Sequence, residues 1–519
     1  MNYWELAAFI AYFVAVLAIG LFFFFRTRGG SEKDYFLGGR NMNGIVAAFS
    51  AGASDMSAWV LMGLPGAICL AGFGQIWISI GLLIGTILAW IFIAPRLRRF
   101  AIKAGDSITV PQFFTNRFKE KNPTLRIACA VIFLVAYCLY AASSITACGK
   151  VFVKIMPALE EYKVWIEVAA ALIIVAYTLL GGFNAVCWTD FIQGMIMLIA
   201  LMVVPIIAFI MLRANGPVAE VVTGANYYSF LSSGKFDWTS VAEILTGLGW
   251  GLGYFGMPHI VIRYMSIRSE KDMKRSQFVG IIWFIIILVF ATLVALIAHE
   301  YLGSTINKDN SESVFIILVE KIFGHGALAL VGGLLLSAII AAAMSTADSQ
   351  LLASSSAFSS DIYKSVIRKD AGDKEMMWVG RIAVAVILIL ALLIALFGPN
   401  SIMSLVSAAW SIFGASFGPI MILALYWRRF NFKGACASII SGFFVSILWM
   451  VLFNFEYYGF KSVIYNTGLY EIIPGFIVGM ITAVVVSLCT KAPGEEVTAL
   501  FDSVGKSVEN DEVSEENVA

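Results

Sequence analysis

Long apolar runs recur along nearly the whole chain and are separated by short polar connections. A run of about 20 apolar residues is long enough to cross the hydrocarbon core of a bilayer. Backbone amides in lipid must find partners within the protein, and a helix supplies those partners inside a single segment. The pattern therefore predicts an all-α polytopic membrane protein with thirteen transmembrane helices. We place these spans at residues 4–26, 44–70, 74–97, 125–155, 164–182, 188–213, 239–264, 276–302, 325–358, 376–398, 402–427, 432–454 and 471–490.

The second expected span is interrupted by small and polar residues, in the string SAGASDMS over residues 50–57. A carboxylate such as Asp55 costs at least about 2.5 to 3.5 kcal/mol at this depth, so it is a candidate for function. Gly and Ser weaken a helix. A local unwinding here would free carbonyl oxygens, the ligands that a small hard cation prefers. The alternative is that Asp55 pairs with a buried arginine or caps a short helix.

The seventh expected span contains the glycine-rich string TGLGWGLGYFGMPH over residues 246–259. Trp250, Tyr254 and Pro258 are spaced four apart and would share one helix face. Pro258 has no amide hydrogen, so the carbonyl of Tyr254 loses its usual helical partner. We therefore predict a second break, with the two aromatic rings as a wall of a substrate site. For the glycines alone, close helix packing is an equal explanation.

The ninth expected span carries a third polar string, AAAMSTADSQ over residues 341–350. Ser345, Asp348 and Ser349 fall on one helical stripe, and Thr346 lies at its edge. A stripe with a carboxylate favours cation coordination toward the second span, although single serines in membrane helices often only bond the preceding turn. Asp190 begins the sixth span, where it could face the same region or cap that helix.

The two broken spans are five spans apart, which is the separation expected of two related halves of inverted topology. Spans 2–6 and 7–11 would form these halves, with core repeats at about 44–213 and 239–427. Such repeats place their binding site near the bilayer midplane, between the interrupted helices. We therefore expect a single transmembrane domain over residues 1–493.

Composition and charge agree with a membrane protein and set its orientation. The chain is 60% hydrophobic and 13% charged, with a mean hydropathy of +0.87, whereas soluble domains carry about 25% charged residues. Short cytoplasmic loops collect Lys and Arg. With an outside N-terminus and a cytoplasmic C-terminus, 27 of the 35 basic residues fall on the cytoplasmic side. We read these basic loops as topology signals and not as a nucleic-acid site.

The ends of the chain and the cysteines add little chemistry. The first span shows no small-residue cleavage pattern, so we expect it to be retained as an anchor. The seven cysteines lie within or at the ends of apolar spans without metal-ligand spacing, and we interpret them as packing residues. Residues 494–519 are acidic and poor in large apolar residues, which predicts a disordered cytoplasmic tail.

Five strings occur in the order found in one known family: GGR at 38–40, SAGASDMSAWVLMGLPGA at 50–67, WGLGYFGMPH at 250–259, MST at 344–346 and YEIIPGF at 470–476. On these strings the chain resembles the solute:sodium symporter family, most closely its bacterial proline-transporting members. The similarity runs from near the N-terminus to about residue 495. It implies a leucine-transporter-like fold of five plus five inverted repeats, with one span added before and two after.

The resemblance also implies an ion site. A sodium ion would be held by carbonyls and hydroxyls, with Asp55 as nearby negative charge. The implied ligands are the carbonyls of Ala53, Met56 and Ala342 and the hydroxyls of Ser345 and Thr346. Asp348 and Ser349 depart from the proline-transporting pattern and resemble the second-sodium site of a sialic-acid member, with Asp190 as a further ligand.

For the substrate, the resemblance implies sodium-driven uptake of a small amino acid, L-proline first, by alternating access across the bacterial cytoplasmic membrane. It assigns coupling to Arg40. The implied substrate contacts are Ser57, Tyr140, Trp250, Tyr254 and Pro258. Met257 replaces a glutamine beside this pocket. No obligate protein partner is expected.

Other functions remain as alternatives from the sequence. The solute could instead be a sugar, sialic acid, pantothenate or choline. A sensor that binds solute without moving it is disfavoured, because nothing after residue 495 is long enough to signal. An enzyme is not expected, since the chain has no HExxH motif, nucleophile elbow or paired catalytic carboxylates, and its three histidines are scattered.

Overall fold

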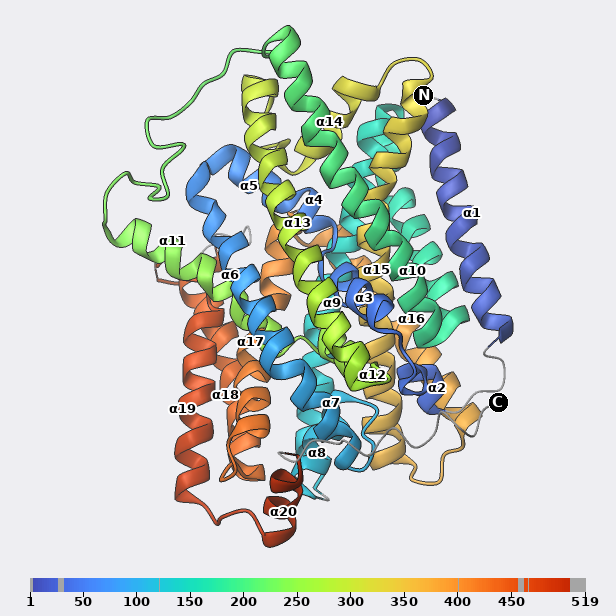
Figure 1. Ribbon diagram of the computed structural model, residues 1–519, viewed down its shortest axis with the longest axis vertical. Coiled ribbons are helices and arrows are strands. Elements are labelled where there is room, and N and C mark those ends of the chain that lie inside the picture. The colour runs from blue at the N-terminus through green and yellow to red at the C-terminus, as the bar shows by residue number, and fades with distance from the viewer. Residues whose placement is uncertain are drawn as a thin grey trace.

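Helices are the regular secondary structure of the described residues, which contain no strand beyond one isolated backbone bridge (Figure 1). It is a computed structural model that describes residues 3–26, 32–120, 122–399, 401–455, 462–464 and 466–504. Its α-helices are α1 Tyr3–Arg26, α2 Glu32–Leu37, α3 Gly44–Asp55, α4 Ala58–Leu61, α5 Gly63–Ala71, α6 Ile76–Leu88, α7 Ala94–Lys103, α8 Val110–Phe118, α9 Thr124–Ile155, α10 Lys163–Asn215, α11 Trp238–Gly249, α12 Pro258–Ser266, α13 Glu270–Leu302, α14 Val314–Phe323, α15 Leu328–Ser356, α16 Asp373–Phe397, α17 Ile402–Tyr426, α18 Phe432–Trp449, α19 Ile472–Cys489 and α20 Glu495–Ser503.

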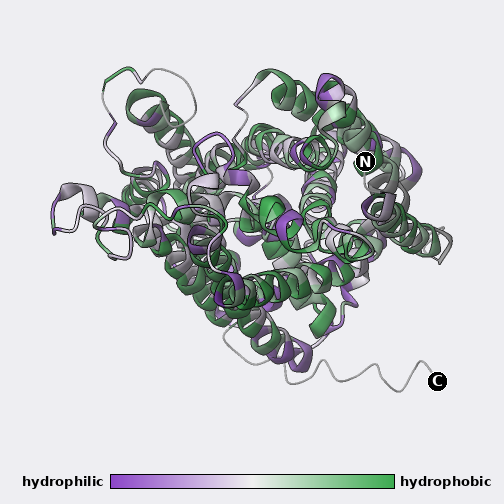
Figure 2. Ribbon diagram, turned by 90° about the horizontal axis from the view of Figure 1, so that it is seen from above, coloured by the Kyte–Doolittle hydropathy of each residue, from purple (hydrophilic) through white to green (hydrophobic). Residues whose placement is uncertain are grey.

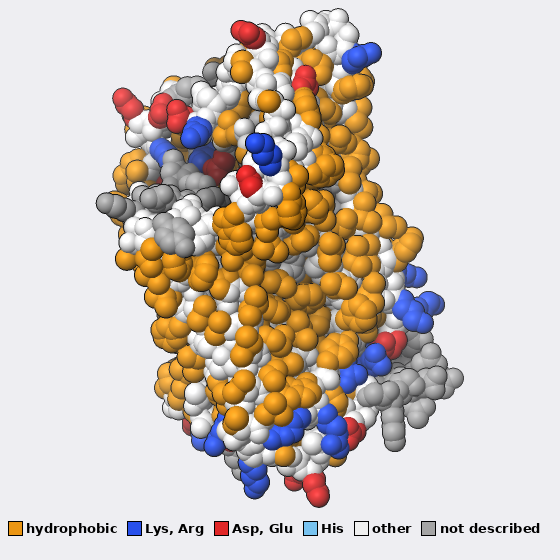
Figure 3. Space-filling view, turned by 90° about the vertical axis from the view of Figure 1, so that its left-hand side faces the viewer, with side chains coloured by type: hydrophobic (Ala, Val, Ile, Leu, Met, Phe, Trp, Pro, Cys, Tyr) orange, Lys and Arg blue, Asp and Glu red, His pale blue; other side chains and the backbone are white. Residues whose placement is uncertain are grey.

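Within the described residues, ten helical spans are long and apolar enough to cross a membrane, some of them made of consecutive elements such as α6 and α7. The bent pair of α3 with α4–α5 qualifies as one more span. Viewed along the bundle, hydrophobic residues dominate the helices (Figure 2). On the face shown in Figure 3, hydrophobic side chains form a wide belt between two ends where the charged side chains gather. The molecule therefore has the surface of a membrane-embedded bundle.

Two of the thirteen expected spans do not stand as separate long helices. Residues 164–182 belong to α10, which continues to Asn215 through a kink where Gly182 has a φ of 62°. Only glycine adopts that conformation without strain. Residues 239–264 are divided into α11, a 3₁₀ segment η5 over Trp250–Phe255, and α12. The described residues thus confirm an all-helical bundle, whereas the count of thirteen spans stays a prediction.

Both predicted interruptions are present. Between α3 and α4 the chain leaves the helix at Met56 and Ser57, and the two halves of this span meet at an angle of 71°. In the second broken span, a turn at Gly256 and Met257 separates η5 from α12, and Pro258 begins the new helix. Proline suits a first helical turn, where its missing amide costs nothing. The residue types that suggested the breaks are the ones found at them.

Helices α3 and α12, one from each broken span, lie side by side and run in opposite directions. Met42, just before α3, forms a bridge with Ile267, just after α12. The Met42 amide donates to the Ser266 carbonyl at 3.1 Å. Further into both helices, Arg263 of α12 donates to the Ser50 hydroxyl of α3. The start of one broken span therefore lies beside the end of the other.

The prediction of a disordered tail over residues 494–519 is wrong for its first residues. Residues Glu495–Ser503 form α20, which packs beneath the bundle at its lower end in Figure 1. The Phe501 ring lies 4.9 Å from the Arg117 guanidinium carbon, and Lys103 donates to the Ser503 carbonyl at 2.7 Å. Arg428 forms an ion pair with Asp502 at 2.8 Å. These contacts therefore order a segment whose composition alone predicted disorder; residues 505–519 lie outside the described structure.

Candidate functional site

The carboxylate of Asp55 lies at the end of α3, where the helix breaks, and is fully buried. The Tyr254 hydroxyl of η5 donates to its Oδ2 at 2.5 Å. No hydrogen-bond donor among the described residues reaches its Oδ1. The alternative that Asp55 pairs with a buried arginine is not seen there. A buried carboxylate with one free oxygen can stabilise a nearby cation.

Next to Asp55, oxygens of α3 and α15 meet. The Ser345 hydroxyl lies 2.8 Å from the carbonyl oxygen of Ala53 and 3.2 Å from that of Ala342. The adjacent Thr346 hydroxyl is fully buried, and no partner for it is present among the described residues. Met56, whose carbonyl was predicted as a further ligand, lies at the break and is fully buried. The structure therefore brings three of the predicted ligands into contact, and the other two follow them directly in the chain or lie at the adjoining break.

An aromatic layer contacts Asp55 through Tyr254 and Trp59. The Trp250 ring stacks on Tyr470 with centroids 5.1 Å apart and on Trp59 at 6.0 Å. The Tyr254 ring contacts Trp410 edge-on at 5.2 Å. The predicted pair Trp250 and Tyr254 is thus joined by three rings that the sequence did not single out. No short sequence pattern joins these three rings, because they come from α4, α17 and the segment before α19.

The other predicted substrate residues lie at the two breaks. The Tyr140 hydroxyl of α9 donates to the Asp55 carbonyl at 3.1 Å. Ser57 caps α4, with its hydroxyl accepting from the Trp59 amide at 3.4 Å. Pro258 opens α12 and is buried. Ser57 and Pro258 therefore lie at the starts of helices, and Tyr140 binds a carbonyl at the break that follows α3.

A cavity of about 610 Å³ reaches this layer where α5 ends and α17 begins. In Figure 1, α5 lies toward the end of the bundle opposite to α20. Trp250 and Tyr470 line it, together with the polar side chains of Gln75, Glu243, Lys308 and Glu471. Asp55 and Tyr254 do not line it and are fully buried. A solute entering here would meet the Trp250 ring before it meets Asp55.

At the other end of the bundle, Arg40 joins three elements. Its guanidinium donates to Asp106 at 2.7 Å, to the Met265 carbonyl at 2.6 Å and to the Ser107 carbonyl. Burial disfavours a charged Asp106, but hydrogen bonds from Lys33 and Arg40 hold its pKa below the usual range. Arg40 therefore lies apart from the Asp55 group, at the junction of α2, the α7–α8 connection and the end of α12.

The residues predicted for a second sodium ion lie on α10 and α15, where Ser349 is one turn beyond Ser345. Asp190 Oδ2 accepts from the Ser50 hydroxyl at 2.6 Å, and Ser349 lies 3.4 Å from the same oxygen. The Arg263 guanidinium of α12 also contacts Asp190 Oδ2, at 3.2 Å. Asp348, next to Ser349, is fully buried. The structure thus brings Asp190 and Ser349 together and adds an arginine that the sequence did not indicate.

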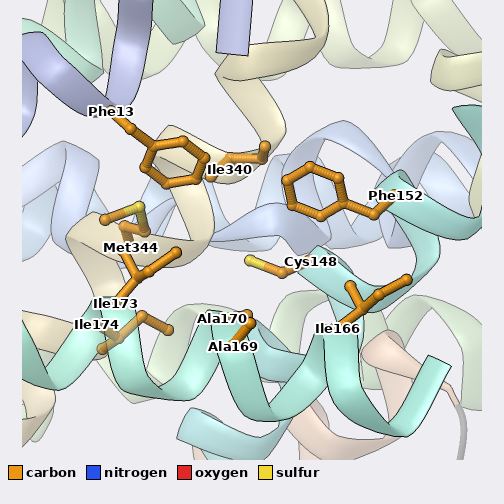
Figure 4. A pocket seen from close by; sticks show the side chains of 10 residues that line it. All are labelled: Phe13, Cys148, Phe152, Ile166, Ala169, Ala170, Ile173, Ile174, Ile340 and Met344. Carbon is orange, nitrogen blue, oxygen red and sulfur yellow. The ribbon is translucent and has the colours of Figure 1, made fainter. Parts of the chain in front are cut away.

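A separate cavity of about 190 Å³ lies between α1, α9, α10 and α15 (Figure 4). Its side chains are hydrocarbon and sulfur, as Figure 4 shows, and Met344, which directly precedes Ser345 in the chain, is one of them. A charged or zwitterionic solute would lose its hydration there without gaining polar partners. This cavity is therefore unsuited to an ion or an amino acid.

Comparison with known proteins finds one family and, among others, three relatives that match nearly the whole chain. The model of the sodium:solute symporter family matches residues 35–442. The osmoregulated proline transporter OpuE of Bacillus subtilis is 40% identical, covering 95% of this chain and 96% of its own. The high-affinity proline transporter PutP of the same organism is 41% identical, covering 94% and 98%. Sodium/proline symporter 2 of Staphylococcus saprophyticus is 39% identical, covering 96% and 95%.

Solved structures share the fold. A Na⁺-coupled sialic acid symporter, 20% identical, superposes with a TM-score of 0.72 over 95% of this chain and 99% of its own. MhsT in complex with L-phenylalanine, 14% identical, gives 0.55 over 85% and 98%. These neighbours confirm the expected leucine-transporter-like architecture, while the boundaries of its repeats stay a prediction.

Proposed function

The chain belongs to the sodium:solute symporter family, and on that premise we propose that it couples inward sodium flow to the uptake of L-proline. Relatives of about the same length that are named as proline transporters or sodium/proline symporters support this substrate. A membrane potential contributes about 2.3 kcal/mol per charge per 100 mV, so sodium entry can drive accumulation of a neutral solute. The protein is a transporter and not an enzyme.

The observation that carries this proposal is the contact between the Ser345 hydroxyl and the Ala53 carbonyl, 2.8 Å apart on two different helices. Hydroxyl and carbonyl oxygens are the ligands that hard cations take. In the proposal, sodium binds between α3 and α15, to the carbonyls of Ala53, Met56 and Ala342 and the hydroxyls of Ser345 and Thr346. Asp55 balances its charge from the end of α3.

Proline would lie on the other side of the break in α3. Its ring packs against Trp250 and Tyr254, and its carboxylate points to the N-terminal end of the α4–α5 segment, where a helix dipole favours negative charge. Ser57, Tyr140 and Pro258 complete the pocket. Because Asp55 contacts Tyr254 directly, an ion that orders the end of α3 also orders the substrate wall.

In the proposal, alternating access uses a cavity at one end of the bundle and a bonded contact that closes the other end. The cavity that stops at Trp250 is the outer vestibule, and Arg40 fastens the inner end by binding Met265, Asp106 and Ser107. The opposite directions of α3 and α12, given by the Met42–Ser266 and Ser50–Arg263 contacts, support inverted repeats 2–6 and 7–11 within thirteen spans. The distribution of basic residues supports an outside N-terminus. In the proposal, the arginine-rich end faces the cytoplasm of a bacterial cell, because short cytoplasmic loops collect Lys and Arg.

Uptake by purified protein in liposomes tests the function. Radiolabelled proline should accumulate with an inward sodium gradient and only equilibrate without one. Ser345→Ala should abolish the gradient dependence. Ser337→Ala is the matched control, because Ser337 is buried on the same helix but bonds only the Gly333 carbonyl within it. Absence of gradient-driven proline uptake would refute the proposal.

A competition panel separates the other solutes. Unlabelled sialic acid, sugar, pantothenate and choline should leave proline uptake unchanged at concentrations where unlabelled proline abolishes it. If one of them inhibits the sodium-dependent uptake more strongly than unlabelled proline does, the substrate assignment is wrong while sodium coupling stands.

A further inference from the structure

The Arg263 guanidinium is enclosed by oxygen atoms from four helices. Its Nε donates to the Ser50 hydroxyl of α3 at 3.1 Å, and its Nη1 donates to the His259 carbonyl of α12 at 2.6 Å. Its Nη2 donates to Asp190 Oδ2 of α10 at 3.2 Å and to the Ser349 hydroxyl of α15. Arg263 and Asp190 are both fully buried or nearly so. The guanidinium thus has the oxygen surroundings that a bound cation would have.

The oxygen atoms around the Arg263 guanidinium lie one helical turn away from those of the proposed sodium site. Ser349 follows Ser345 by four residues on α15, a rise of about 6 Å. Ser50 precedes Ala53 by three residues on α3. The same two helices therefore supply oxygens at two levels, one at Ser345 and one at Ser349. At the second level the cation is part of the protein.

We propose that Arg263 is a tethered cation that takes the place of a second sodium ion, so that a single sodium ion is bound in each transport cycle. The inference rests on the proposed sodium coupling and deepens it by assigning the ion stoichiometry. Two of the three residues expected to hold a second ion, Asp190 and Ser349, are already bonded to the guanidinium. A buried carboxylate needs one positive partner, and Arg263 supplies it permanently.

Removal of the tethered charge should make room for an ion. Arg263→Ala leaves the Asp190 carboxylate with the Ser50 and Ser349 hydroxyls around a space where the guanidinium had been. Sodium can then enter as the missing positive charge. Asp190→Asn combined with Arg263→Gln removes both charges, so the second level should again take no ion.

Sodium counting on the purified full-length protein tests this directly. Equilibrium binding of ²²Na⁺ without proline should give a single ion per chain for the wild type and for the double variant, and a second ion for Arg263→Ala. Added guanidinium chloride should release that second ion and leave the first. Arg117→Ala is the matched control, since Arg117 is a buried arginine bonded to the Ala424 carbonyl, and its loss should not add an ion.

Two results would overturn the proposal. One is a wild-type chain that binds two sodium ions. The other is an Arg263→Ala protein with a normal melting profile that still binds a single ion. If Arg263→Ala does not fold, Arg263→Gln alone replaces it in the binding measurement. A second bound ion then supports the proposal, and a single bound ion overturns it. A chain that binds a single sodium ion but does not accumulate proline would refute the proposed function and leave the role of Arg263 standing.

Discussion

At the residue scale, Asp55 combines full burial with a single hydrogen bond to its carboxylate among the described residues, from Tyr254. Hydrogen bonds to charged groups contribute about 1.5 to 3 kcal/mol. Asp55→Asn keeps the size of the side chain but removes its charge. We expect the sodium concentration for half-maximal uptake to rise at least about tenfold, which corresponds to about 1.4 kcal/mol. Initial uptake rates across a sodium series measure this.

The control for that change is Asp502→Asn. Asp502 is half-exposed and pairs with Arg428 at the surface, where such pairs contribute little. Its sodium dependence should match the wild type. An Asp55→Asn protein with unchanged sodium activation would show that this carboxylate takes no part in ion binding.

Trp250 belongs to the same scale, because its ring stacks on both Tyr470 and Trp59. Aromatic pairs contribute about 0.5 to 1.5 kcal/mol beyond their burial. We therefore expect Trp250→Ala to raise the proline concentration for half-maximal uptake about tenfold, with less effect on sodium activation. Trp165→Ala serves as the control, since Trp165 is 69% exposed. Equal effects of the two changes would remove Trp250 from the substrate wall.

At the scale of elements, α6 and η5 approach so closely that glycine is required on both. A Cβ added to Gly85 would lie 2.2 Å from the Gly251 carbonyl oxygen, and one added to Gly251 would lie 2.3 Å from that of Gly81. Both obstacles are backbone, so an added methyl group must push the elements apart. Because η5 carries Trp250 and Tyr254, this packing sets the position of the substrate wall.

Gly85→Ala should therefore lower both stability and transport. Overpacking costs about 1 to 3 kcal/mol, which would appear as a lower melting temperature of the purified protein together with reduced proline uptake. Gly20→Ala on α1 is the matched change, because no atom lies within 4 Å of its added Cβ. A Gly85→Ala protein as stable and active as the Gly20→Ala protein would contradict the close packing of α6 and η5.

At the scale of the whole molecule, the distribution of Lys and Arg predicts which end faces the cytoplasm. Gly494, just before α20, and Gly224, in the connection before α11, are both exposed, with no atom within 4 Å of an added Cβ. In a protein with Cys489 changed to serine, an impermeant maleimide should label Gly224→Cys in intact cells. Gly494→Cys should be labelled only in inverted membrane vesicles. The reverse pattern would invert the proposed topology.

The sequence by itself determined the helical class, the membrane location and the two broken spans. Apolar length, glycine content and a proline within a span act locally, and the breaks at Ser57 and Pro258 follow from such local causes. The stripe of Ser345 and Thr346 was also visible, because helical periodicity places neighbouring residues on one face.

Only the tertiary structure decided which distant groups meet. Arg263 and Asp190 are 73 residues apart, and Trp250 and Tyr470 are 220 apart in numbering. No local pattern encodes such pairs, since they depend on how whole helices pack. The order of α20 has the same origin, because Phe501 finds its partners on α7 and α8 and not within its own segment. The sequence determined the elements and their interruptions, and packing between them chose the partner of each buried charge.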